Sequence, residues 1–172
     1  MMRKIVIGLT VLFSFVLQGT LMQWISLGRI APNLLIITTS AYGFMRGKKN
    51  GLLVGFFCGL LTDIFFGEVI GFYAIIYMYI GYANGMFHRV FFPEDIKLPL
   101  FLITVSDFVY GFAVYVLLYL LRGRFLLSYY FLHVIVPEMV YTIVMTVLFY
   151  PIYLKINRKF DEIEKRSEKK FV

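Results

Sequence analysis

Charged residues and cysteine are both scarce in this 172-residue chain. Only 16% of its residues are charged, against about 25% in ordinary soluble domains, so a fully solvated globular surface is excluded. The one cysteine, Cys58, excludes an intramolecular disulfide framework, and its place in an apolar run is typical of a small packing residue. The chain is therefore neither a soluble domain nor a disulfide-stapled one.

The motifs of common catalytic and metal sites are missing as well. There is no HExxH or CxxC spacing, and His88 and His133 stand far apart, so we predict no metal site. No GxxxxGK[ST] or GxGxxG loop is present to cradle a phosphate, and no serine, histidine and acid are spaced as a nucleophilic triad. We therefore predict a protein that is not an enzyme and carries no cofactor.

Apolar residues dominate what is present. The chain is 60% hydrophobic and 19% aromatic, with a mean hydropathy of +0.82. A membrane-spanning helix takes about 20 apolar residues, and six charge-poor runs cover residues 5–27, 30–45, 51–66, 70–87, 98–121 and 127–154. We predict an all-α integral membrane protein, with a bundle of six transmembrane helices in residues 1–154.

Two of these runs, 30–45 and 51–66, are short for a bilayer core of about 30 Å, so re-entrant segments are an alternative. The turn 46–50 between them contains three cations, which would be costly to bury at membrane depth. Two short spans surrounded by protein are therefore favoured.

The basic residues predict the orientation. With the N-terminus inside, fourteen of the seventeen fall on cytoplasmic segments, and only Arg29, Arg122 and Arg124 fall outside. This asymmetry follows the positive-inside rule and predicts that both termini are cytoplasmic. The net charge of +7 suits an anionic lipid surface and needs no nucleic acid to explain it.

The only sizeable polar segment is the basic tail, residues 155–172. Its apolar residues recur at helical spacing, and two acids precede bases by four residues, which predicts an amphipathic helix that extends the sixth span: Ile156, Phe160 and Ile163, with the pairs Asp161–Lys165 and Glu162–Arg166. Two interpretations stay open. The tail is either a solvated end with lipid-contacting bases or a docking site for a cytoplasmic partner.

Small residues line one face of the third run. Gly51, Gly55, Gly59 and Asp63 recur every four residues and so share one helix face. In lipid, such a glycine row lets another backbone approach closely. We predict that this face is the interface with a partner polypeptide, which Asp63 orients. A second small pair, Gly81 and Gly85, predicts packing between the chain's own helices.

Polar residues inside the apolar runs are expensive in lipid, so each should face the bundle interior, a water cavity or a partner. The intramembrane set is Asn33, Asp107 and Glu138, in addition to Asp63. Arg29 is a candidate counter-ion for Asp63. The alternative for each acid is an internal hydrogen bond that only fixes packing, although Pro137 removes a backbone donor beside Glu138 and opens the helix there.

Several segments together resemble the rod shape-determining protein MreD family. They are Ala-Pro-Asn-Leu-Leu at 31–35, Gly-Phe-Phe-Cys-Gly-Leu-Leu-Thr-Asp at 55–63, and the Gly67 to Gly71 turn before an aromatic helix. The resemblance covers essentially the whole chain and is strongest from Ala31 to Gly85.

The resemblance implies a non-enzymatic scaffold of the bacterial cell-elongation (rod) complex in the inner (cytoplasmic) membrane. Proteins similar to this one bind MreC, a single-span protein, and through it connect MreB actin-like filaments with the RodA glycosyltransferase and a class B penicillin-binding transpeptidase in peptidoglycan synthesis. The family also resembles the six-helix substrate-binding subunits of energy-coupling-factor transporters. The alternative function is a small-solute-binding subunit of a transporter, which the scarcity of polar residues in the outer loops disfavours.

Overall fold

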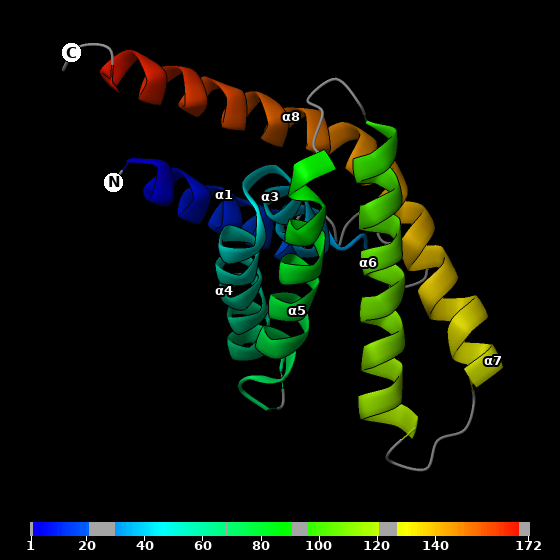
Figure 1. Cartoon of the computed structure of the whole chain (residues 1–172). Coiled ribbons are helices and arrows are strands. Elements are labelled where there is room, and N and C mark those ends of the chain that lie inside the picture. Colours follow the sequence, from blue (N-terminus) through cyan, green and yellow to red (C-terminus); the bar gives the residue numbers. More distant parts are fainter. Residues whose placement is uncertain (1, 21–29, 68, 91–95, 121–126, 169–172) are drawn as a thin grey trace.

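The computed structural model describes residues 2–20, 30–67, 69–90, 96–120 and 127–168 (Figure 1). Its elements are all helical in these ranges: α1 (Met2–Gly19), α3 (Leu34–Arg46), α4 (Lys48–Phe66), α5 (Phe72–Met86), the 3-10 turn η1 (Phe87–Val90), α6 (Lys97–Tyr115), η2 (Val116–Leu120), α7 (Leu127–Tyr130), η3 (Phe131–Ile135) and α8 (Val136–Glu168).

Each expected apolar run contains a helix in the described part of the chain, which supports the all-α prediction. Within the described ranges, three helices are long and apolar enough to cross a membrane: Lys48–Phe66, Lys97–Leu120 and Ser128–Ile163. The second helix is shorter than its run, because it begins only at Leu34 and residues 30–33 enter it as irregular chain. Residues 21–27 of the first run lie outside the described residues.

Two π-helical segments, η2 and η3, adjoin the ends of the long helices α6 and α8. The segment η2 ends the α6 helix, and η3 leads directly into α8. Pro137 follows η3 and has no N–H to donate to the carbonyl four residues earlier, so a regular α-helical hydrogen bond cannot form there. The wider π turn is a local solution that keeps the helix continuous past this residue.

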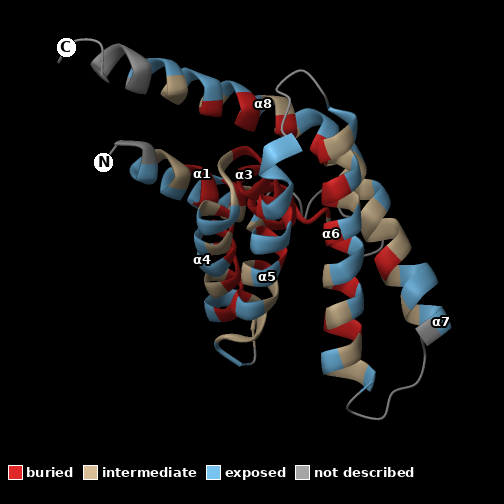
Figure 2. Cartoon of the chain, in the orientation of Figure 1, coloured by how far each residue is buried: buried red, intermediate tan, exposed pale blue. Residues whose placement is uncertain are grey.

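Helix α3 is the centre of the fold. All twelve residues from Leu34 to Met45 are buried, and α1, α4, α5, α6 and α8 all contact this helix. Figure 2 shows it as the red centre of the bundle. A helix that is hydrophobic on every side has to be covered on every side, and its hydroxyls bond within the bundle, as when Thr38 donates to the Leu34 carbonyl at 2.8 Å.

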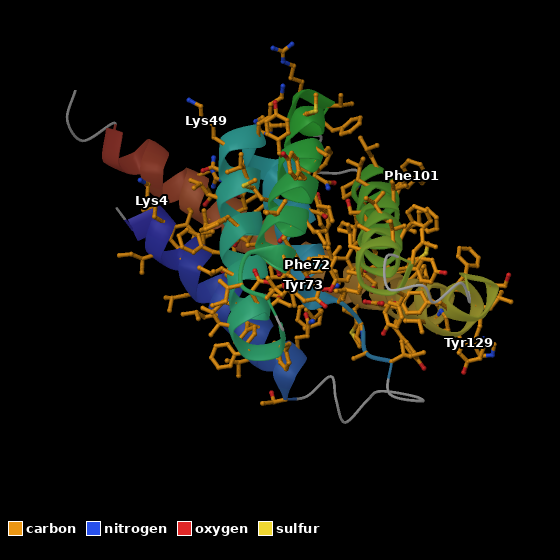
Figure 3. The ribbon with its side chains drawn as sticks, turned by 90° about the horizontal axis from the view of Figure 1, so that it is seen from below. Lys4, Lys49, Phe72, Tyr73, Phe101 and Tyr129 are labelled. Carbon is orange, nitrogen blue, oxygen red and sulfur yellow. The ribbon has the colours of Figure 1, made fainter. Side chains whose placement is uncertain are left out.

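The outer surface is apolar. Large side chains on the outer faces are more than half exposed, including Phe57 and Ile64 on α4, Phe101 on α6 and Val144 on α8. Phe101 and Tyr129 project away from the bundle (Figure 3). Soluble proteins rarely expose a contiguous apolar surface of this kind, whereas lipid-facing helices are expected to do so.

The C-terminal half of α8 folds over the bundle instead of projecting away from it (Figure 1). Tyr153 hydrogen-bonds Ser14 of α1 at 2.9 Å, and Thr38 of α3 donates to the same hydroxyl at 3.0 Å. Farther along, Asp161 pairs with Arg46 at 2.8 Å. The expected tail helix is therefore continuous with α8. The described partner of Asp161 is Arg46, while the side chains of Lys165 and Arg166 lie outside the described residues.

Candidate functional site

The glycine row of α4 faces α5 of the same chain. A Cβ atom built on Gly51 would collide with the Gly81 carbonyl oxygen, one on Gly55 with the Tyr77 carbonyl oxygen, and one on Gly59 with the Ala74 backbone. The two helices thus touch backbone to backbone at three positions over slightly more than two turns, the approach that glycine permits in a membrane. We call this contact the α4–α5 seam.

The prediction that this glycine row is the interface with a partner polypeptide is wrong, because α5 covers it. Gly51, Gly55 and Gly59 cannot seat a partner polypeptide on the face that α5 already occupies. The sequence shows that a backbone must approach the row, but the spacing of the glycines does not distinguish a helix of the same chain from a helix of another. Loop length decides between them here, because only residues 67–71 separate α4 from α5.

Gly81 and Gly85 form the α5 side of the same seam. A Cβ atom on Gly81 would meet the Gly51 carbonyl, and one on Gly85 would meet the backbone of Lys48. The packing expected of this pair is therefore what the structure contains, and its partner is the glycine row itself.

Asp63 closes the end of the seam nearest the α4–α5 turn and caps α5. Its Oδ2 accepts hydrogen bonds from the backbone N–H groups of Gly71 and Ala74, both at 2.9 Å, and its Oδ1 accepts one from Tyr73 at 2.8 Å. A helix N-terminus carries unpaired N–H groups and a partial positive charge, so it satisfies a buried carboxylate without a counter-ion. Asp63 therefore orients α5 and not a partner. Arg29, its expected counter-ion, lies outside the described residues.

Asn33 caps α3 and gathers a second group of polar residues. Its side-chain oxygen accepts from the Ile36 N–H at 3.1 Å and from the Tyr77 hydroxyl at 2.9 Å. Its own N–H donates to Thr142 Oγ1 at 3.2 Å. Helices α3, α5 and α8 therefore meet around one buried amide, which is 3% exposed.

Asp107 and Glu138 lie beside this amide. Thr142 neighbours the Asp107 carboxyl group and Asn33 neighbours that of Glu138, and the two acids are close enough to repel one another electrostatically. Both carboxylate oxygens of Asp107 are buried with no hydrogen-bond partner of ordinary geometry among the described residues. We call Asn33, Asp107, Glu138 and Thr142 the polar centre. The intramembrane residues expected from the sequence thus come together, with the exception of Asp63.

Two hydroxyl networks were not anticipated from the sequence. Ser14, Thr38 and Tyr153 join α1, α3 and α8. Asn84 donates to Ser106 of α6 at 2.7 Å and to Ser40 of α3 at 3.3 Å. The signal for both was the presence of small polar residues in apolar helices, which bond across helices in membranes.

An apolar groove lies between α1 and α4 on the outer surface. Its cavity volume is about 580 Å³, and its walls are one face of α1 from Lys4 to Leu12 and one face of α4 from Asn50 to Ile64. Gly8 belongs to this lining, and a Cβ atom added to it would meet nothing within 4 Å. Gly8 therefore faces open space, whereas the glycines on the other face of α4 are covered by α5.

Comparison with known proteins identifies the family. A family model described as "rod shape-determining protein MreD" matches residues 1–160 of the 172 residues. No curated protein and no solved structure matches the chain. Because the family model covers nearly the whole chain, including the α4–α5 seam, the polar centre and the groove, this protein belongs to the MreD family of rod shape-determining proteins.

Proposed function

We propose that this chain is a non-enzymatic scaffold of the bacterial rod complex and that it binds the transmembrane helix of an MreC-like single-span protein in the α1–α4 groove. Six helices cross the cytoplasmic membrane with both termini in the cytoplasm. Through its partner, the chain helps to connect MreB-like filaments with a RodA-like glycosyltransferase and a class B penicillin-binding transpeptidase. In this way it helps to organise peptidoglycan synthesis and rod cell shape.

The observation that carries this proposal is the groove. Its α4 wall runs from Asn50 to Ile64, about 21 Å at 1.5 Å per residue, which is about two thirds of the hydrocarbon thickness. Two neighbouring helices offer a third helix a groove for its side chains. Association in lipid depends on close packing, and the bare backbone at Gly8 permits close approach.

The test fills the groove without disturbing the fold. Gly8→Leu adds a side chain where a Cβ atom has no neighbour within 4 Å, so the chain should still fold while the groove is blocked. We expect co-purification of the MreC-like partner to fall at least tenfold. The matched control is Leu9→Phe on the same helix, because Leu9 is 58% exposed and is not part of the groove lining.

Thermal unfolding of each variant without the partner separates folding from binding. The expected result is unchanged unfolding for both variants, with partner binding lost only in Gly8→Leu. Wild-type co-purification by a well-folded Gly8→Leu would contradict the groove as the seat of the partner helix.

A further inference from the structure

The polar centre is assembled by three helices that bring oxygen atoms to one place. Asp107 is on α6, while Glu138 and Thr142 stand one turn apart on the same face of α8. Asn33 precedes the first turn of α3 and links to Thr142 through its N–H. Figure 1 shows α6 and α8 side by side, and contacts between the two helices agree with that view.

Among the described residues, the hydrogen bonding of this centre is incomplete. Asp107 is 2% exposed, and neither of its carboxylate oxygens has a hydrogen-bond partner of ordinary geometry among the described residues. A second carboxyl group, that of Glu138, lies beside it. Buried charges are costly unless paired or bound to a cation. The basic residue of α3, Arg46, is at the opposite end of that helix and pairs with Asp161.

The surroundings restrict the occupant to a small ion. Asp107 and Thr142 are 2% and 0% exposed, so the long side chain of a partner's lysine or arginine has no room to reach them while the helices stay packed. Glu138 is partly exposed, so packing does not fully close the α8 side of the centre. Carboxylate and hydroxyl oxygens are the ligands that hard cations prefer.

The same surroundings favour a single positive charge. The N-terminus of α3 already contributes a partial positive charge beside the two acids. Mg²⁺ releases its water reluctantly and demands a nearly octahedral set of ligands, whereas a monovalent ion loses its water at a lower cost. The π turn η3 ends only three residues before Glu138, and such turns are frequent at functional sites.

We propose that Asp107, Glu138 and Thr142 form a binding site for one small monovalent metal cation between α6 and α8. The ion bridges the two helices and holds them against the N-terminal end of α3. This site does not depend on the partner or on the groove, so its test uses the purified chain alone.

The first experiment measures thermal unfolding of the full chain in detergent. NaCl or KCl replaces N-methylglucamine chloride at constant ionic strength. We expect Tm to rise with the logarithm of the ion concentration above the Kd, by about 3–6 °C at ten times the Kd. Asp107→Asn and Thr142→Val should lose this dependence, and Asp161→Asn, which removes an acid elsewhere, should retain it. A rise that persists in both centre variants, or none in the wild type, overturns the proposal.

A second experiment needs only the wild-type chain and so decides the matter if the variants do not fold. Equilibrium binding of ²²Na⁺ should saturate near one ion per chain and be displaced by unlabelled Na⁺. No saturable binding overturns the proposal. Displacement by Mg²⁺ at lower concentration than by Na⁺ or K⁺ also overturns it, as does a Tm that responds to pH but not to either alkali cation.

Discussion

At the scale of single residues, the buried carboxyl groups of Asp63 and Asp107 differ in their hydrogen bonding. Three backbone N–H groups satisfy Asp63, while the oxygens of Asp107 have no such donors among the described residues. Both side chains are almost fully buried. The difference arises because Asp63 faces a helix N-terminus directly, whereas Asp107 projects from the middle of α6 toward a second acid. The carboxylate of Asp63 is therefore satisfied within the fold, whereas that of Asp107 has none of these donors.

The capping role of Asp63 predicts a loss of stability in Asp63→Asn. The amide retains only one acceptor oxygen, so at least one of the three buried N–H groups loses its bond. Hydrogen bonds to charged groups contribute about 1.5–3 kcal/mol each, and we expect a destabilisation of that order. Thermal or denaturant unfolding in detergent measures it, with the exposed acid variant Glu162→Gln as control. Unchanged unfolding together with loss of the partner would instead assign Asp63 to the interface.

At the scale of elements, the α4–α5 seam depends on the absence of side chains. Gly55 meets the backbone of Tyr77 and Met78, and Gly81 meets that of Gly51, so neither helix has a flexible group that could move aside. A lipid-embedded helix pair gains little from hiding apolar groups that lipid would solvate equally well. Close backbone packing is what remains to hold the pair together.

The seam predicts opposite effects for one substitution at two positions. Gly55→Ala should destabilise the chain by about 1–3 kcal/mol, because one methyl group overpacks a backbone contact. Gly8→Ala should be neutral or stabilise the chain by up to about 1 kcal/mol, since alanine is the better helix former and the site is open. Unfolding of both variants under identical conditions tests the pair. Equal effects of the two changes would contradict the seam.

At the scale of the whole molecule, the tail of α8 connects the last helix to the first two. Tyr150, Tyr153 and Leu154 are buried, and Asn157 follows one turn later, also buried. One turn farther along α8, Asp161 pairs with Arg46 of α3, and the Asp161 side chain is 40% exposed. Packing therefore holds α8 as far as Asn157, and the ion pair acts on the turn that follows.

A local effect is accordingly expected for Asp161→Asn. A partly exposed ion pair contributes about 0–1 kcal/mol, so the midpoint of global unfolding should move by no more than about 4 °C. Hydrogen–deuterium exchange in residues 157–163 should become several times faster, because the last turns of the helix open more often. Glu162→Gln is the neighbouring control. Unchanged exchange in Asp161→Asn would show that the ion pair does not restrain the tail.

Much of this protein was predictable because the deciding physics is local. A run of apolar residues must form a helix in lipid so that its own backbone groups are satisfied, and the helices follow the charge-poor runs closely from α4 to α6. The intramembrane polar residues could be identified for the same reason, since each is costly wherever it lies. Asn33, Asp107 and Glu138 were found in this way, and the structure brings them together.

The sequence alone thus identified the glycine row and the buried acids as contact residues, but only the tertiary structure decided their partners. Four-residue spacing shows that Gly51, Gly55 and Gly59 admit a backbone, yet it contains no information on whether that backbone is α5 or another chain. Likewise, the cost of burying Asp63 is local, while the donors that offset it come from the start of α5. The spacing of residues is a property of one helix, whereas a contact depends on the positions of two helices.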